Sequence, residues 1–515
     1  MNQHDKARFD VLVEWSRKRG AELHPSLEIY HDNVTGYSLR VNPSLSSSLG
    51  PEFVAVTCPL STTLSFLNAL IDGPLDFSSG SSSQSSNAAF PPRFMQSSPP
   101  HVIGRFFLIR EYLKGKQSFW WPYLATLPAP DHIAAWAPPS FWPEDDVVYL
   151  DGTNAGIAIA EIQANIKQEF KHARKVLKEE NWPGYSDYTQ LLYKWAYSIF
   201  TSRSFRPSLI LSSAVEQRIT AILPHGCRID DFSILQPLFD IANHSPTARH
   251  TWDTIPTVGG SGEACRLICH DPYQPGEQVF NNYGSDKTNS ELLLAYSFIL
   301  PESDALHNDY VHVRKRGPAS DADRDRCDGT SGRQQQQKTD FLISLRPITH
   351  PSSLAAHARL RLAALTQPPS SASSSPFSML KYFTHFEPAL IDDLVSAVAT
   401  PEEKVALHKW TAASRDADCT DAMDPPPELA GLVDRARGIL ITKLQTELLR
   451  LRSICVQGNE DESEEGDAAV ESSSEDDDEE VVLPSPGNRN QALAVEYRRQ
   501  CERVLRRALG VLKWE

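Results

Sequence analysis

A cluster of polar and aromatic residues between positions 195 and 300 contains side chains that could do chemistry. It consists of four short segments, residues 202–205, 240–245, 280–284 and 291–298. The first ends a helix-like pattern, the second follows an apolar run, and the third follows a Pro-Gly-Glu turn signature. Each segment alone is typical of a turn, a strand end or a surface charge. All four in this order favour a binding or catalytic site.

Two other candidates for chemistry have simpler readings. The Gly-Gly-Ser-Gly run at 259–262 precedes a strand-like segment instead of opening a helix, which favours a hairpin turn over a nucleotide-binding loop. Cys265 and Cys269 would share one face of a strand but lie about 13 Å apart by strand rise, too far to hold one ion together. We therefore expect buried thiols and no metal site.

The elements expected to position the four segments are short strands followed by helices. Apolar periodicity predicts helices over 9–20, 155–177, 188–200, 439–454 and 493–512, and strands over 37–41, 53–58, 249–254 and 264–270. Stretches rich in serine, proline or glutamine at 78–100, 316–340 and 367–376 lack the composition of a packed core. The prediction is an irregular β region followed by a helical domain.

The composition excludes several classes of protein. With 515 residues, 40% of them hydrophobic and 23% charged, the chain is neither wholly disordered, nor collagen-like, nor a small disulfide scaffold. No apolar run reaches the ~18 residues of a membrane helix, and the first residues lack the apolar stretch of a secretory signal. The eight scattered cysteines suit a reducing compartment. We expect a cytoplasmic or nuclear protein without membrane contact.

The net charge of −16 is concentrated in one segment. Residues 460–480 contain 13 acidic residues and no basic one, which leaves −3 for the rest of the chain. Such a run is typical of a solvated, disordered segment, and its charge could attract basic proteins. Because no basic stripe stands out elsewhere, we expect no direct binding of nucleic acid.

The four segments resemble those of SET-domain protein-lysine methyltransferases, in the branch of the Rubisco large-subunit methyltransferase, which includes fungal ribosomal-protein lysine methyltransferases. The specific part is Asn243-His244-Ser245 combined with Tyr283-Gly284. Residues 35–39 fall where the family has a Gly-x-Gly turn, residues 118–128 look like the start of this branch's helical insertion, and residues 496–500 are similar to its C-terminal domain. The resemblance covers most of the chain.

The resemblance implies an α+β fold and a domain order. We expect a SET domain of short β-sheets with a knot-like crossing and a helical insertion, followed by an all-α C-terminal substrate-binding domain. The N-terminal part of SET would occupy 1–110, with a disordered insertion at 78–100, and the helical insertion 111–230. The C-terminal SET core would occupy 231–300, and the helical domain 301–515, with disordered insertions near 316–340 and 456–488.

The same resemblance implies S-adenosyl-L-methionine as the cofactor and assigns roles to residues. The positions that match cofactor-binding residues are Gly36, Tyr37, Ser38, Arg203, Asn243, His244, Tyr283 and Phe298. Tyr283 matches the tyrosine whose hydroxyl lies near the transferring methyl, and Tyr296 a second aromatic of the lysine channel, so these two are the expected catalytic residues. Asp240, Arg206 and Tyr296 are expected to contact the substrate. Methyl transfer to an amine is an in-line displacement, so positioning does most of the work.

Departures from the family pattern keep other functions open. Ser38 replaces the second loop glycine and Ser297 the glycine of a Tyr-Gly-Phe motif. Serine fits either position only where the backbone avoids positive φ. One alternative is therefore a SET-fold binding module with weak or lost catalysis, and another is a protein-histidine methyltransferase. The expected partner is a protein that presents a lysine, not a histone; the family suggests a basic ribosomal protein or a translation factor.

Overall fold

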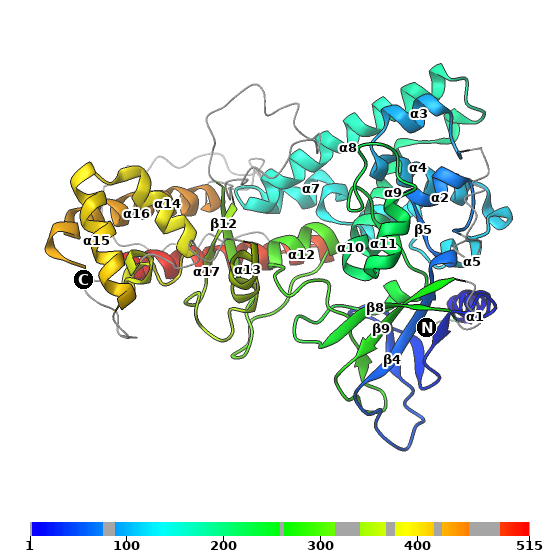
Figure 1. The fold of residues 1–515 in the computed structure, drawn as a ribbon, viewed down its shortest axis with the longest axis horizontal. Helices are drawn as coiled ribbons and strands as arrows, with labels where there is room; N and C mark the ends of the chain where they lie inside the picture. The colour runs from blue at the N-terminus through cyan, green and yellow to red at the C-terminus, as the bar shows by residue number, and fades with distance from the viewer. Residues whose placement is uncertain are drawn as a thin grey trace, which may run out of the picture. The chain divides into compact units, whose positions relative to one another are not determined.

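The chain folds into two compact units in this computed structural model, whose described residues are 3–75, 88–257, 262–314, 340–366, 376–416, 425–452 and 485–513. One unit consists of Met1–Phe141 and Glu161–Ser285, the other of Trp142–Ala160 and Asp286–Glu515 (Figure 1). The second unit thus begins earlier than the predicted boundary at 301 and also takes residues from the predicted helical insertion. The reason is packing, because Trp142, Leu150 and Ile159 lie in the core of the second unit.

Among the described residues, three small antiparallel sheets belong to the first unit. Their strands, in spatial order, are β1 (Glu22–Leu23), β4 (Phe53–Pro59), β9 (Glu263–Cys269) and β8 (His250–Pro256); β10 (Gln278–Val279), β3 (Gly36–Val41) and β2 (Leu27–Asp32); and β5 (Leu64–Ser65), β7 (Ile234–Leu235) and β6 (Ser204–Phe205). Each sheet joins a strand from the first 65 residues to one from beyond position 200. The predicted short strands are confirmed, and the sheets bring the two ends of the predicted SET domain together.

Helices of the first unit gather beside these sheets (Figure 1). They are α1 (Gln3–Arg17), α2 (Phe66–Ile71), α3 (Pro92–Ser97), α4 (Pro100–Leu113), α5 (Trp121–Leu124), α6 (Ile133–Trp136), the later part of α8 (Asn154–Glu179), α9 (Gln190–Arg203), α10 (Pro207–Ile210) and α11 (Ser213–Thr220). Helix α4 is buried on nearly all sides and packs against α2 and α9. It is therefore the central helix of this group, and the predicted helices over 9–20, 155–177 and 188–200 are confirmed as α1, α8 and α9.

The described part of the predicted insertion at 78–100 is folded. Residues 76–87 lie outside the described part of the chain, but residues 88–100 are ordered around α3, with Phe90 and Phe94 buried in the core. A proline at the first position of a helix costs no hydrogen bond and presets φ, and Pro92 and Pro100 start α3 and α4 in this way. The proline pairs thus mark helix starts, and Phe90 and Phe94, on either side of the first pair, anchor the segment in the core.

The β8–β9 hairpin has the predicted strands. Residues 258–261, most of the Gly-Gly-Ser-Gly run, lie outside the described residues, and the Thr257 amide donates to the Gly262 carbonyl at 2.8 Å where the strands meet. Cys265 and Cys269 are both buried on β9, which confirms their reading as buried thiols. Burial raises the pKa of Cys269 to about 12.

The second unit is mostly helical. Its elements are α7 (Glu144–Val147), α12 (Asn289–Tyr296), β11 (Tyr310–Arg314), β12 (Asp340–Ser344), α13 (Leu354–Thr366), α14 (Pro388–Val398), α15 (Pro401–Asp416), α16 (Ala430–Arg452) and α17 (Arg489–Lys513). Helices α16 and α17 pack against each other, as their apolar stripes predict. The antiparallel ribbon β11–β12 is an addition to the all-α domain that was expected.

The other predicted insertions fall mainly outside the described residues. These are 316–339, 367–375 and 456–484, while Asp340 already belongs to β12 and Asn488 donates to Asp146 at 2.7 Å. Asp340 and Asn488 thus belong to the folded second unit, although both lie within predicted insertions. No helix in the described ranges is long and apolar enough to cross a membrane.

Candidate active site

A tight turn between β2 and β3 forms one wall of the candidate site. The Asp32 carboxylate accepts hydrogen bonds from the amides of Val34 at 2.8 Å and Thr35 at 2.6 Å. Burial raises the pKa of Asp32, but the bonds from Thr35 and Val34 outweigh it and lower the value to about 2. Gly36 follows with φ 71°, a left-handed conformation that glycine adopts without strain. The turn is thus locked by a charged side chain and a glycine.

Gln278 on β10 connects this turn to the Asn-His segment. Its Oε1 accepts from the Ser38 hydroxyl at 3.1 Å and from the Asn243 amide, also at 3.1 Å, while its Nε2 donates to the Tyr30 hydroxyl. Asn243 also donates to the Thr35 carbonyl at 3.4 Å. Two predicted cofactor residues therefore meet at a glutamine that sequence reasoning missed. No local signal marks Gln278, because its partners come from residues far away in the sequence.

The Asn-His and Tyr-Gly segments lie side by side, as predicted. His244 and Asn281 form a parallel β-bridge, in which the Asn281 amide donates to the Asn243 carbonyl at 2.7 Å and the Ser245 amide to the Asn281 carbonyl at 2.9 Å. The pairing is main-chain, so it fixes the two segments regardless of their side chains. It places Asn243, His244 and Tyr283 within one small region of the first unit.

Tyr283 is held by both its backbone and its hydroxyl. Its amide donates to His244 Nδ1 at 3.0 Å, and the two rings stack with centroids 5.1 Å apart. Its hydroxyl donates to the Ala242 carbonyl at 3.1 Å. This bond orients the phenol oxygen, and an oriented phenol oxygen is a group that can accept weak C–H···O contacts.

A buried polar cluster of Tyr123, Asp240 and Arg203 supports the segment before Asn243. The Tyr123 hydroxyl donates to Asp240 Oδ2 at 2.8 Å, and Arg203 Nη1 donates to the Oδ2 and the carbonyl oxygen of Asp240 at 3.4 Å. Burial lowers the pKa of Arg203, but the Asp240 charge outweighs it and raises the value. The arginine side chain keeps 27% exposure against 1% for Asp240. The contacts of Asp240 are thus with the protein interior, and its expected contact with substrate stays a prediction.

Tyr37 and Arg206 lie apart from these contacts. Successive strand residues point to opposite faces, so Ser38 faces Gln278 while Tyr37 packs against Phe9 with ring centroids 4.7 Å apart. Burial and the neighbouring Asp5 raise the pKa of Tyr37 to about 12. A side-chain contact of Tyr37 with a cofactor is therefore not supported. Arg206 is exposed just before α10.

Tyr296 and Phe298 belong to the second unit. Their rings lie 6.1 Å apart at the end of α12, and burial, followed by the charge of Glu291, raises the pKa of Tyr296 to about 12. Between them Ser297 has φ 61° and ψ 36°. The expectation that both replacement serines avoid positive φ is met by Ser38 and is wrong for Ser297, because the helix ends there in a left-handed cap.

Buried polar atoms near the paired segments have hydrogen-bonding capacity left for a polar ligand. Among the described residues, Asp240 Oδ1, Asn281 Nδ2 and both amide atoms of Gln236 have no hydrogen-bond partner. Buried polar groups are normally satisfied, and a ligand with amino, carboxylate and adenine groups offers donors and acceptors of both kinds. The residues present therefore fit a nucleoside-amino-acid cofactor such as S-adenosylmethionine.

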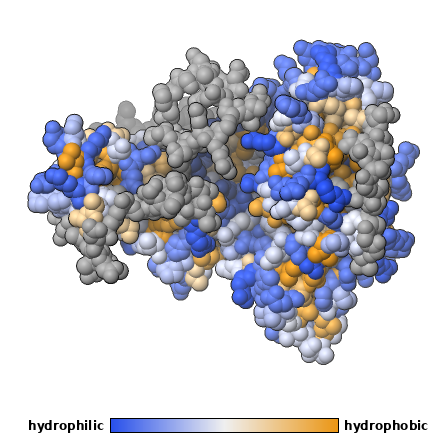
Figure 2. Space-filling model, in the orientation of Figure 1, coloured by the Kyte–Doolittle hydropathy of each residue, from blue (hydrophilic) through white to orange (hydrophobic). Residues whose placement is uncertain are grey.

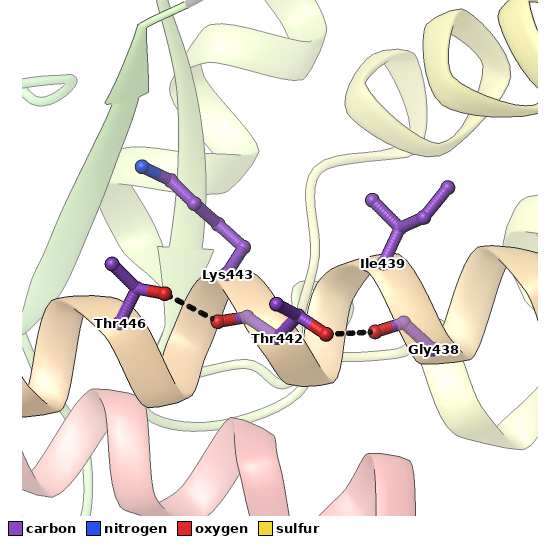
Figure 3. A pocket seen from close by; sticks show the side chains of 5 residues that line it. All are labelled: Gly438, Ile439, Thr442, Lys443 and Thr446. Atoms are coloured by element: carbon purple, nitrogen blue, oxygen red, sulfur yellow. Dashed lines mark hydrogen bonds between the residues drawn. The ribbon is translucent and has the colours of Figure 1, made fainter.

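A separate pocket along α16 contains none of the predicted site residues. It is lined by Gly438, Ile439, Thr442, Lys443 and Thr446 (Figure 3). The hydroxyls of Thr442 and Thr446 donate to carbonyls of their own helix at 2.9 and 2.8 Å. No set of polar groups converges in it, so we do not regard it as the active site.

Comparisons with known proteins agree with the resemblance. No family model matches the chain. The ribosomal lysine N-methyltransferase set10 of Schizosaccharomyces pombe is 27% identical over 316 residues, 59% of this chain and 49% of that protein. The protein-lysine N-methyltransferase EFM1 of Saccharomyces cerevisiae is 22% identical, over 57% and 50% of the two chains. The human actin-histidine N-methyltransferase is 22% identical, over 61% and 46%. The chain spans about half the length of these curated relatives.

Solved structures give the fold. The SET domain of LSMT bound to lysine and AdoHcy superposes with a TM-score of 0.55 at 17% identity, covering 99% of this chain and 91% of that one. Rubisco LSMT bound to AdoMet gives 0.52 at 17% identity, covering 98% and 91%. The predicted α+β architecture is confirmed. The chain is thus similar in sequence to proteins named lysine or histidine N-methyltransferases, and it has the fold of Rubisco LSMT.

Proposed function

We propose that this protein is an S-adenosylmethionine-dependent methyltransferase that modifies a lysine of a non-histone protein. The observation that carries the proposal is the main-chain pairing of Asn243 and His244 with Asn281, beside the Gly36 turn. Homology to named lysine methyltransferases supports the reaction class. The ordered contacts of Tyr283 argue against the alternative of a binding module without catalysis.

Each residue of the site has a role that its observed contacts allow. S-adenosylmethionine, when bound, supplies an electrophilic methyl group on a sulfonium. Asn243 and the backbone at His244 would bind the cofactor, and the exposed part of the Arg203 guanidinium would pair with its carboxylate. The Tyr283 hydroxyl, oriented by Ala242, would accept from the methyl group and align it with the attacking nitrogen. The channel role of Tyr296 and the cofactor role of Phe298, both in the second unit, stay predictions.

A basic ribosomal protein or a translation factor is the substrate class that we propose. A relative in S. pombe is named a ribosomal lysine N-methyltransferase. The 13 acidic residues at 460–480 give this chain a charge complementary to that of a basic protein.

Titration calorimetry with S-adenosylmethionine tests the cofactor site. We expect the wild-type protein to bind S-adenosylmethionine and Asn243→Ala to bind it at least tenfold more weakly. The variant lacks the side-chain amide that donates to Gln278 and to the Thr35 carbonyl. Asn165→Ala, an exposed residue of α8, is the matched control and should bind like wild type. Equal binding by both variants would remove Asn243 from the site, and no binding by folded wild type would overturn the proposal.

Labelled methyl transfer to ribosomal proteins tests the substrate class. The protein is incubated with ribosomes and tritiated S-adenosylmethionine, and the labelled residue is identified by mass spectrometry. We expect label on a lysine. Label on a histidine would show the histidine alternative, for which actin-histidine N-methyltransferases are similar relatives.

A further inference from the structure

One face of α8 in the first unit carries a row of basic residues. Lys167, Lys171, Arg174 and Lys178 follow at spacings of four, three and four residues, and Lys175 lies beside them. Such spacing places side chains in one stripe along a helix, about 16 Å long at 1.5 Å per residue. Figure 2 shows that hydrophilic residues cover much of the first unit near the end that holds α3 and α8. We call these five residues the basic stripe.

An open groove runs along the basic stripe. Besides the five basic residues it is lined by Phe170, Tyr185 and Gln190, with no acidic residue among the lining side chains. The Arg174 guanidinium lies 6.0 Å from the Phe170 ring centroid and 5.8 Å from that of Tyr185. Its Nε has no hydrogen-bond partner among the described residues. The Phe170 and Tyr185 rings thus pack against Arg174 in the groove, and no described carboxylate forms an ion pair with this arginine.

Most of the positive charge of the basic stripe is not neutralised by the described surroundings. Lys175 has one weak contact, 3.7 Å to Glu179, and that glutamate also pairs with Arg93 at 2.8 Å. An exposed pair of this length contributes little. Lys167, Lys171 and Lys178 are exposed and have no ion pair with a described residue. The groove therefore attracts anions.

The chemistry of the groove distinguishes between kinds of anionic partner. Interfaces with proteins have apolar cores that are depleted of lysine, whereas interfaces with nucleic acids are polar and strongly positive. Only two half-buried rings accompany five cations here. A duplex presents two backbones across a groove about 12 Å wide, and a single row of cations matches one backbone.

We infer that the basic stripe binds the phosphate backbone of a single-stranded nucleic acid, for which oligouridine is the probe. The lysines act as point charges and Arg174 offers a planar fork for phosphate, so the five cations contact the backbone and not the bases. Binding should therefore depend strongly on salt and weakly on sequence. The inference departs from the expectation of no direct contact with nucleic acid, and it does not rest on the proposed methyl transfer. The stripe escaped sequence analysis because its members become neighbours only at the helical period.

The test is fluorescence anisotropy of the full chain with a labelled 20-nucleotide oligouridine at several salt concentrations. For a single strand, the logarithm of the binding constant falls with the logarithm of the salt concentration, with a slope of about 0.7 for each neutralised phosphate. Five phosphate contacts therefore predict roughly 100-fold weaker binding at 200 mM than at 50 mM salt. The triple variant Lys167→Gln, Lys171→Gln, Lys178→Gln keeps two contacts and should weaken only about 7-fold over this range. Glutamine is a good helix former, so α8 should persist, which circular dichroism checks.

A matched variant removes the same charge elsewhere. Lys6→Gln, Lys404→Gln, Lys409→Gln changes three exposed lysines outside the groove and should keep the wild-type salt dependence. If both triple variants lose the same amount of oligouridine affinity, net charge alone explains the loss and the proposed site is wrong. Polyglutamate of the same length should bind at least tenfold more weakly than oligouridine, and equal or tighter binding would indicate an acidic protein partner instead. Absence of oligouridine binding at 50 mM salt would also overturn the inference.

Discussion

Replacing Ser297 by glycine is expected to make the second unit more stable than replacing it by alanine, by about 1 kcal/mol. Ser297 ends α12 with φ 61° and ψ 36°. In this left-handed region a side chain with a Cβ costs roughly 1–2 kcal/mol, while glycine adopts it without that strain. The extra entropy of glycine in the unfolded chain offsets about 0.5–1 kcal/mol of the gain. The Ser297 carbonyl, which accepts from Arg489 at 3.3 Å, is present in both variants.

Ser38 is expected to give the opposite order. It is fully buried in β3, lies outside the positive-φ residues and donates to Gln278 at 3.1 Å. Alanine at this position loses that bond, which costs about 1 kcal/mol. Glycine loses it as well and adds about 0.5–1 kcal/mol of unfolded-state entropy. Here glycine should therefore be the less stable of the two variants.

Urea unfolding followed by circular dichroism measures both comparisons. Comparing glycine with alanine at one site cancels the loss of the serine hydroxyl and isolates the backbone effect. With a slope of about 2 kcal/mol per molar urea, 1 kcal/mol moves the midpoint by roughly 0.5 M. If the two variants at position 297 unfold at the same urea concentration, the left-handed assignment of Ser297 is refuted. If the glycine variant is more stable than the alanine variant at both positions, backbone conformation does not explain the stability difference at position 297.

Three further predictions concern the candidate site and the second unit. Tyr283→Phe should lower methyl transfer at least tenfold in the labelling assay and leave calorimetric binding of S-adenosylmethionine near normal; full activity would remove the hydroxyl from the mechanism. Asp240→Ala leaves the Arg203 charge and a tyrosine hydroxyl without their buried acceptor, so the free energy of unfolding in urea should fall by about 3 kcal/mol, and a change below 1 kcal/mol would contradict this. Burial raises the pKa of Asp309 to about 6, although the charge of a neighbouring arginine lowers it. Between about pH 4 and 6 the folded protein therefore keeps this proton while the unfolded chain loses it, so the free energy of unfolding falls as pH rises through that range. Relative to wild type, Asp309→Asn should therefore gain about 2 kcal/mol between pH 4.5 and 7, and a constant difference over that range would show that Asp309 has an ordinary pKa.

The relation between Gln278 and its partners shows where sequence reasoning stops. Asn243 and Tyr283 were assigned roles because each stands in a short motif that resembles one of a known family. Gln278 stands in no such motif, yet it bonds to Ser38 across 240 residues and to Asn243 across 35. Only the pairing of β10 with β3 brings these side chains together.

The sequence by itself determined the features that depend on local patterns. Apolar periodicity located α1, α8, α9, α16 and α17, because burying one stripe of a helix requires that spacing. Turn and proline signals located most strand ends, although the same prolines at 91–100 were mistaken for a linker when they start helices.

The tertiary structure decided everything that depends on partners distant in sequence. It turned Tyr37 towards Phe9 and Ser38 towards Gln278, buried Asp240 beneath Tyr123, and placed Trp142 in the second unit's core. Strand register decides which way a strand residue points, and the neighbours brought by folding decide which groups can bond to a buried charge. Both depend on residues far away in the sequence, beyond the few residues that a sequence pattern covers.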